Sequence, residues 1–247
     1  DKCIQCNMCA FVCPHAAIRP HLVKPENLNN APDSFKSANA MAEKDLKFVM
    51  QVSSKDCTGC GVCASVCPAK EKAIVMQDAT DLMEKENKNY EFVNSIPNEK
   101  SGVFKPNTVK GSQYNMPYFE FSGACAGCGE TPYLKVISQM FGNRMVIANA
   151  TGCSSIYGGS SPTCPFVKDK NGHGIAWANS LFEDNAEFGY GIKIGHQIQQ
   201  DNLRANLNKI YDAELDSELN DLIEEYSGSD ETNRQRELAE LITNKLQ

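Results

Sequence analysis

The sequence predicts an α+β domain built around a repeated cysteine motif, followed by an α/β region that ends in a helical segment. Three observations lead to this fold class. The pattern C-x2-C-x2-C-x3-C-P occurs once within residues 1–20 and again within residues 55–76. A helical pattern, a short apolar run and a Gly/Ser-rich loop follow one another near residues 131–160, which is the order of an α/β unit. From about residue 183 onward, apolar residues recur at helical spacing.

Composition and charge narrow the class of protein. The 247 residues are enough for one large domain or two smaller ones. No apolar run approaches the roughly 18 residues of a membrane-spanning helix, so we expect no membrane association. A net charge of −7 argues against nucleic acid, because binding to it needs a basic face. Since the chain begins just before a motif and ends inside a helical pattern, we expect a piece of a longer polypeptide.

The first domain is expected to contain the two motif repeats and the segments between and after them. Such an internal duplication indicates two similar structural units. Each motif leads through Cys–Pro into an Ala/Ile stretch that is predicted to enter a strand or a short helix. In the insert of residues 14–56, a polar stretch suggests a loop with a short helix, and residues 46–52 alternate as in a strand. Residues 77–116 are polar and broken by Gly and Pro, which predicts an extended connector.

The second region starts near Pro117. Residues 131–141 have apolar residues at helical spacing, with Thr131 as a candidate N-cap and Pro132 at the first helical position. Residues 145–150 are nearly all apolar, as in a buried strand of a parallel sheet. Farther on, helices packing on a core are favoured over a coiled coil, because no heptad is sustained. Their apolar faces are Leu203, Leu207 and Ile210; Leu215, Leu219, Leu222, Ile223 and Tyr226; and Leu238, Leu241, Ile242 and Leu246.

The two cysteine motifs predict two [4Fe–4S] clusters. Each cube has four irons that each take one soft thiolate, and a spacing of three lets a looping backbone present three sulfurs to one cube. The fourth cysteine of such a run ligates the other cube in two-cluster ferredoxins. We therefore assign one cluster to Cys3, Cys6, Cys9 and Cys67, and the other to Cys57, Cys60, Cys63 and Cys13.

Other uses of the twelve cysteines are disfavoured. Disulfide-rich secreted domains are usually much shorter and lack consecutive C-x2-C-x2-C runs. All-cysteine zinc sites normally use two separated C-x2-C pairs. We therefore expect a reducing, cytoplasmic location, and oxygen-sensitive clusters favour an anaerobic organism. His15, beside the first motif, is expected to be a hydrogen-bonding or surface residue rather than a ligand.

A second set of cysteines follows in the later region, and by their spacing alone they fit either a zinc site or a third cluster. They are Cys125, Cys128, Cys153 and Cys164. Two neighbouring features also have simple structural readings. Glu130 fits a first-turn helix carboxylate that the helix dipole favours, and residues 151–154 fit a strand-to-loop turn.

The residues around this second set carry a family resemblance. FSGACAGCGETPYLK at 121–135, ANATGCSSIYGG at 148–159 and WANSLFEDNAEFGYG at 177–191 closely resemble the pyruvate:ferredoxin (flavodoxin) oxidoreductase family. CIQCNMCAFVCPHAAIRP at 3–20 resembles the ferredoxin-like domain of the same family. Its members are large, thiamine-diphosphate-dependent 2-oxoacid oxidoreductases of anaerobes. The resemblance spans essentially the whole chain in one collinear order.

The resemblance implies a domain division and a third cluster. Residues 1–116 would be a ferredoxin-like domain with two [4Fe–4S] clusters, inserts and a connector, and residues 117–247 part of a thiamine-diphosphate-binding domain. Three ligands of a proximal cluster would be Cys125, Cys128 and Cys153, with the fourth beyond the end of this chain.

The resemblance also implies a cofactor site. Glu130 and Cys153 would lie against thiamine diphosphate, whereas the family's Gly-Asp-Gly segment, which holds Mg²⁺ and the diphosphate, is not found in this sequence. Cys164 is expected to be a small buried residue, because free cysteine packs as a small hydrophobe.

The intact enzyme would oxidatively decarboxylate pyruvate to acetyl-CoA and CO2 and pass electrons through its clusters to ferredoxin or flavodoxin. It would use coenzyme A and form a homodimer, and this chain alone would be incomplete and inactive. Two alternatives remain: a stand-alone ferredoxin-type electron carrier with an accessory domain, and an oxidoreductase for a different 2-oxoacid.

Overall fold

The computed structural model describes residues 2–99, 104–159, 164–212, 217–229 and 232–246. Contacts divide the chain into two compact units, Asp1–Phe182 and Glu183–Gln247. The fold is mixed α and β, as expected from the sequence. None of the described helices is both long enough and apolar enough to cross a membrane.

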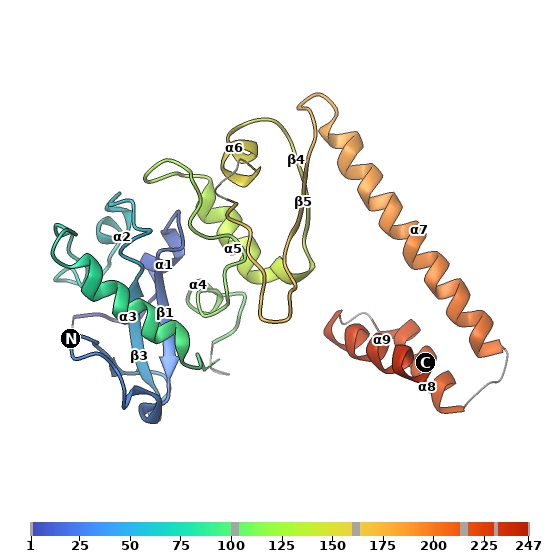
Figure 1. Ribbon diagram of the computed structural model, residues 1–247, viewed down its shortest axis with the longest axis horizontal. Coiled ribbons are helices and arrows are strands. Elements are labelled where there is room, and N and C mark those ends of the chain that lie inside the picture. The colour runs from blue at the N-terminus through green and yellow to red at the C-terminus, as the bar shows by residue number, and fades with distance from the viewer. Residues whose placement is uncertain (1, 100–103, 160–163, 213–216, 230–231, 247) are drawn as a thin grey trace. The chain divides into compact units, whose positions relative to one another are not determined.

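A three-stranded antiparallel sheet organises the first repeat and the insert (Figure 1). Its strands are β1 (Ile18–Val23), β2 (Ala38–Asn39) and β3 (Lys47–Val52), in the order β1-β3-β2. Ile18 lies opposite Val52, and Val23 lies opposite Lys47. The predicted strand at residues 46–52 is thereby confirmed.

Neighbouring residues of β1 and β3 alternate between two apolar clusters, so these two strands pack against apolar side chains on both faces. Leu22 and Phe48 belong to one cluster, which includes Tyr114, whereas Val23 and Val49 belong to the other. The second cluster is completed by Val93 of α3 (Met83–Ser95), which packs on β3 (Figure 1). Each repeat also contributes one short helix, α1 (Met8–Val12) and α2 (Val62–Ser65), and these two helices pack against each other.

The prediction of an extended connector over residues 77–116 is wrong, because this segment contains α3 and α4 (Val109–Ser112). The buried side of α3 includes the polar residues Asn87 and Asn89. The sequence therefore lacks the apolar stripe from which this helix could have been predicted. The Asn87 amide donates to the Glu91 carboxylate at 2.7 Å. The short helix expected in the insert is η1 (Pro25–Leu28), a 3-10 turn.

The later part of the first unit contains the expected helix–strand pair. The helix is α5 (Thr131–Phe141), followed by η2 (Gly142–Arg144), β4 (Val146–Asn149) and α6 (Cys153–Gly159). β4 pairs in parallel with β5 (Ala176–Asn179), as predicted for a parallel sheet, although Val146 is exposed and the rest of β4 only half-buried. Glu130, not Thr131, occupies the N-cap position of α5, so the predicted cap was wrong.

The segment that precedes α5 is tied to the first repeat. The backbone N–H of Phe121 donates to the carbonyl of His15 at 2.9 Å, and Nδ1–H of His15 donates to the carbonyl of Ser122 at 3.1 Å. The carboxylate of Glu120 forms an ion pair with Arg19 of β1, and both side chains are mostly buried. His15 is therefore a buried hydrogen-bonding residue, as expected.

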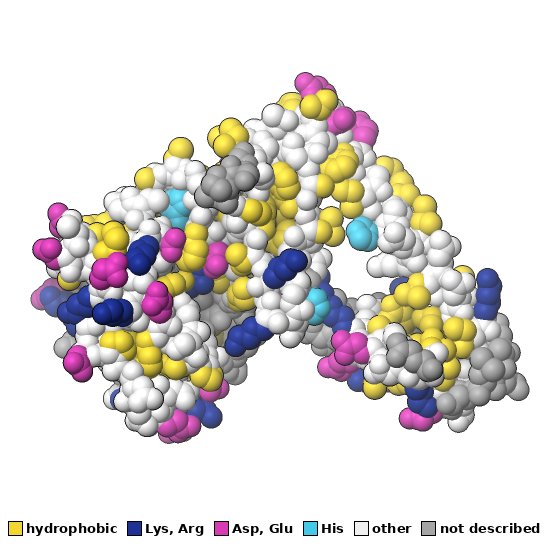
Figure 2. All heavy atoms as spheres, viewed as in Figure 1, with side chains coloured by type: hydrophobic (Ala, Val, Ile, Leu, Met, Phe, Trp, Pro, Cys, Tyr) yellow, Lys and Arg dark blue, Asp and Glu magenta, His cyan; other side chains and the backbone are white. Residues whose placement is uncertain are grey.

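The described residues of the second unit form the helices α7 (Asn185–Asp212), α8 (Ser217–Gly228) and α9 (Thr232–Leu246). The predicted helical faces meet in one cluster of Leu207, Leu219, Ile223 and Ile242. Leu215 lies outside the described residues. Three predicted core residues, Leu203, Leu241 and Leu246, are exposed instead. Figure 2 shows apolar side chains along the surface of α7, where Ile194 and Ile198 are also exposed.

Candidate functional site

The first predicted ligand set lines one cavity. A cavity of about 280 Å³ is walled by four cysteines and by apolar side chains such as Ile4, Ile18 and Met50. The cysteines are Cys3, Cys6, Cys9 and Cys67, three from the first repeat and the last from the second.

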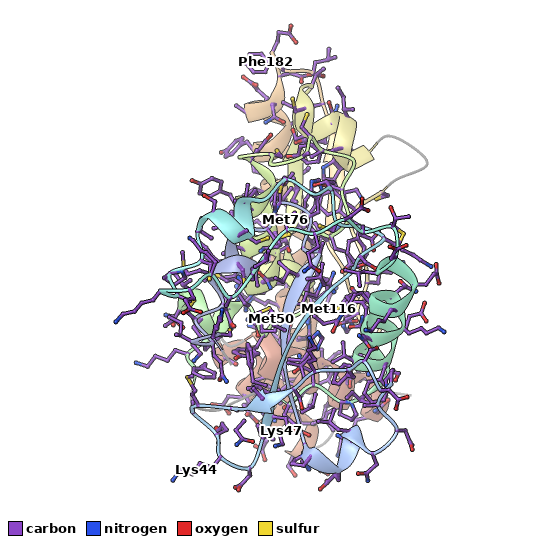
Figure 3. All side chains as sticks on the ribbon, turned by 90° about the vertical axis from the view of Figure 1, so that its left-hand side faces the viewer. Lys44, Lys47, Met50, Met76, Met116 and Phe182 are labelled. Carbon is purple, nitrogen blue, oxygen red and sulfur yellow. The ribbon has the colours of Figure 1, made fainter. Side chains whose placement is uncertain are left out.

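The second predicted set lines a neighbouring cavity of about 320 Å³, walled by Cys13, Cys57, Cys60 and Cys63. Here the single cysteine comes from the first repeat, so the two repeats exchange their fourth cysteines. Met50 borders the first cavity and Met76 the second, and Figure 3 labels both. Four apolar residues border both cavities: Ile18, Val52, Ile74 and Val75.

Left-handed backbone positions allow both cysteine loops to curl. The second loop uses Gly59 and Gly61, with φ of 67° and 75°. At the equivalent positions the first loop has Gln5 and Asn7, with φ of 53° and 61°, a conformation that is unfavourable for residues with a side chain.

Buried side-chain hydrogen bonds hold the first loop in this conformation. The Gln5 amide donates to the carbonyl of Asn39 at 2.8 Å and accepts from the N–H of Met41 at 2.9 Å. The Asn7 amide donates to the carbonyl of Lys110 at 3.0 Å. The sequence of the loop does not reveal these contacts, because their partners lie far along the chain.

The surroundings of these cavities shift the pKa values of their thiols in opposite directions. Burial raises the pKa of Cys9 to about 12, with further increases from Cys3 and Cys6. Burial also raises the pKa of Cys63. The N–H groups of Ala73 and Ala69 lower the pKa of Cys67. Metal ligation deprotonates a thiol outright, so buried cysteines that converge on one cavity fit a thiolate-bound cluster.

No three His, Cys, Asp or Glu side chains converge around a single-ion point within the described ranges. The eight motif cysteines instead surround two cavities, each with room for a larger group. All-thiolate donor sets are those that [4Fe–4S] cubes take, so the residues present fit that group.

The loop of the third set resembles the other two. Gly127, two residues after Cys125, has φ of +73°, as Gly59 does two residues after Cys57. A Cβ on Gly127 would lie 3.6 Å from the Cβ of Cys60. The third cysteine loop therefore packs directly against the second motif.

Tyr157 connects several predicted residues of the later site. Its pKa is raised by burial, then by the charge of Glu130 and a hydrogen bond with it, and then by Cys128 and Cys153. The structure thus brings Glu130, Cys128 and Cys153 to the surroundings of one phenol. Cys125 is an exposed residue across the turn, where its carbonyl accepts from the N–H of Cys128 at 3.0 Å.

Sequence reasoning missed Tyr157, although it follows Cys153 by one helical turn on α6. Residues four apart lie on the same face of a helix, so this spacing could have identified Tyr157 as a neighbour of Cys153 from the sequence. The prediction for Cys164 was wrong. Cys164 is exposed, and its sulfur lies 3.7 Å from the carbonyl oxygen of Gly158 in α6.

Sequence reasoning also missed Lys135 on α5, a lysine that is only 1% exposed. Its Nζ donates to the carbonyls of Ala10 and Phe11 in α1 and to the Gln113 side chain. The sequence offered one indication of this residue, namely a lysine within the apolar helical pattern of residues 131–141.

Comparisons with known proteins agree with this geometry. The 4Fe-4S dicluster domain family matches residues 2–71. Pyruvate:ferredoxin oxidoreductase of Moorella thermoacetica is 51% identical over 98% of this chain and 21% of its own length. Pyruvate-flavodoxin oxidoreductases are 46% identical in Trichormus variabilis, over 100% of this chain and 22% of that protein, and 48% identical in Enterobacter agglomerans, over 98% and 21%. The chain spans about a fifth of the length of these relatives.

Proposed function

Because this chain belongs to the pyruvate:ferredoxin/flavodoxin oxidoreductase family, we propose that it forms the electron-transfer part of an enzyme that oxidatively decarboxylates pyruvate to acetyl-CoA and CO2. The observation that carries this proposal is the crossed arrangement of eight cysteines around two cavities. Such an arrangement suits two one-electron carriers that lie close together. The names of the relatives favour pyruvate over another 2-oxoacid as the substrate.

In this proposal the two ligand sets are those assigned from the sequence. Cys3, Cys6, Cys9 and Cys67 hold one [4Fe–4S] cluster, and Cys13, Cys57, Cys60 and Cys63 hold the other. Each cluster, when bound, would accept and release one electron at a time. The protein contributes thiolates, borders both cavities with the same four apolar side chains, and supports the Cys67 thiolate with backbone N–H groups.

We further propose a third, proximal cluster held by Cys125, Cys128 and Cys153, with its fourth ligand outside this chain. The left-handed Gly127 and its contact with Cys60 support this assignment. Electrons would then enter at the third set, pass to the Cys57–Cys63 loop, and leave from the first cavity towards ferredoxin or flavodoxin.

Thiamine diphosphate with Mg²⁺ is proposed for the intact enzyme, where it supplies the electron sink for decarboxylation. This chain would contribute the Glu130 carboxylate and Cys153. Tyr157 supports this, because its phenol orients Glu130 by a hydrogen bond beside Cys128 and Cys153. Coenzyme A as acyl acceptor, a homodimer, a cytoplasmic location and an anaerobic host complete the proposal.

Iron analysis of the reconstituted chain tests the proposal. The chain, loaded anaerobically with iron and sulfide, should hold about eight irons in two [4Fe–4S] clusters with EPR signals after reduction. Cys9→Ala should lose one cluster's signal, because a buried ligand of the first cavity is removed. Cys164→Ala is the matched control and should keep both signals, since its thiol faces solvent.

Two outcomes would contradict the proposal. Stoichiometric zinc without iron would exclude the clusters. Tight binding of thiamine diphosphate to this chain alone would exclude the view that the cofactor site needs residues from elsewhere.

A further inference from the structure

Lys135 is a buried cation that lies against the short helix of the first cysteine repeat. It belongs to α5, far along the chain from the motifs, yet its ammonium group reaches the last turn of α1. There it donates to the carbonyls of Ala10 and Phe11, the latter at 3.0 Å. The side chain of Gln113 accepts a further hydrogen bond at 3.3 Å.

The charge of this ammonium group lacks an anionic side-chain partner in the protein part that the structure describes. No aspartate or glutamate there lies within ion-pairing distance of it. Arg19 is close enough to add repulsion, and its own charge is paired with Glu120. Burying a charge costs free energy unless an opposite charge lies nearby. The described aspartate and glutamate side chains do not provide one for Lys135, so a bound group would have to supply it.

The position of Lys135 identifies that counter-charge. Ala10 and Phe11 lie between Cys9, which lines the first cavity, and Cys13, which lines the second. Burial lowers the pKa of Lys135 to about 8, whereas Cys13 and Cys9, in the thiolate form that cluster ligation requires, favour its charged form. The ammonium therefore sits where one ligand of each cavity acts on it.

We propose that Lys135 is the shared counter-ion of both tandem clusters and raises the reduction potential of each. This inference rests on the proposed function, in which the cavities hold [4Fe–4S] clusters. One-electron reduction adds one negative charge to a cluster and leaves its ligands in place. A fixed cation in a low-dielectric interior stabilises that added charge, so the reduced form becomes easier to reach.

Lys110 provides an internal comparison. The pKa of Lys110 is lowered by burial, while Cys6 and Cys3 favour its charged form, and both of these cysteines line the first cavity. Its Nζ lies 4.3 Å from the ring centroid of Phe104, which is a cation–π contact. Lys110 should therefore influence one cluster, whereas Lys135 should influence both.

The test is an EPR-monitored redox titration of the full chain after anaerobic reconstitution. Lys135→Met removes the charge and the hydrogen bonds, and Lys135→Gln removes the charge but keeps an amide donor for the carbonyls of α1. Both variants should shift both midpoints to more negative values, by about tenfold in each reduction constant, or about 59 mV for a one-electron couple. Lys110→Met should shift only one midpoint. Lys88→Met, at an exposed position of α3, should shift neither.

The outcomes separate the inference from the function on which it rests. If the parent chain binds no iron, the proposed function fails. If the parent shows two clusters but the Lys135 variants keep their midpoints, the inference alone is overturned. If both Lys135 variants lose iron while Lys88→Met retains it, the lysine serves the fold rather than the potentials, and the inference is again overturned.

Discussion

At the scale of single residues, His21 is a buried group without a visible partner. It lies on β1 and is 6% exposed, and neither ring nitrogen has a hydrogen-bond partner among the described residues. Burial, together with a smaller effect of the charge of Arg19, lowers its pKa to about 4. The neutral form is therefore the one that the folded protein accepts.

This shift makes folding stability depend on pH. The unfolded chain takes up a proton at His21 below about pH 6.5, whereas the folded chain does so only near pH 4. The free energy of unfolding should therefore fall as the pH is lowered from 6.5 to 4, by up to about 3 kcal/mol from this residue. Urea unfolding of His21→Leu at several pH values should show a flatter dependence.

A variant of an exposed histidine separates this effect from general acid sensitivity. His196→Gln on α7 changes a side chain in contact with solvent and should keep the pH dependence of the parent. An unchanged slope in His21→Leu would contradict the prediction.

The sequence predicted the eight motif cysteines as two crossed sets because their spacing dictates how a looping backbone can present sulfur. Lys135 could not be predicted in the same way. Its carbonyl partners in α1 lie 124 and 125 residues away, and no local pattern records such a contact. The same holds for Gln5, whose left-handed conformation depends on Asn39 and Met41.

At the scale of elements, the ion pair of Arg19 and Glu120 fastens β1 to the segment that leads into the third cysteine loop. The guanidinium also lies 5.0 Å from the ring centroid of Phe121. Both charged side chains are less than a fifth exposed, so solvent screens this pair weakly.

Glu120→Gln should therefore destabilise the protein by about 1–3 kcal/mol in urea unfolding, because the Arg19 charge stays largely buried without its carboxylate. Glu84→Gln is the matched control. Its exposed pair with Lys55, at 3.5 Å, should change stability by less than about 0.5 kcal/mol. Equal effects of the two changes would show that burial does not set the strength of the first pair.

Element-level prediction succeeded where apolar spacing is strong and failed where buried faces are polar. The bounds of α5 were predicted correctly, yet its buried face carries Thr131, Lys135, Ser138 and Gln139, whereas Tyr133 is 74% exposed. The helix period was correct, but the face that packs inside was not the apolar one. Helix α3 was missed for a related reason, since polar Asn89 is among its buried residues.

At the scale of the whole molecule, every cysteine that this chain is predicted to contribute as a ligand belongs to the unit Asp1–Phe182. The predicted division at residue 116 falls inside this unit and stays a prediction. The later half of the unit supplies contacts to the cluster loops, through Ser122, Glu120 and Lys135.

Two shortened chains test this arrangement. A chain of residues 1–182 should retain both tandem clusters, since every cavity wall is kept. A chain of residues 1–116 should lose iron faster under a chelator, because the contacts from α5 and the preceding segment are removed. The measurement is iron per chain against time. Equal retention by the two chains would show that residues 1–116 form a self-sufficient cluster domain.

The exchange of fourth cysteines between the cavities has a consequence for how the protein is made. A ribosome releases Cys3, Cys6 and Cys9 early, but their cavity gains its last cysteine only when Cys67 emerges. Cys13 likewise waits for the Cys57–Cys63 loop. Neither site can close until the second repeat has been synthesised, and both then become complete within a few residues of chain growth. If the cavities hold the proposed clusters, iron and sulfide are needed only once the second repeat has been synthesised.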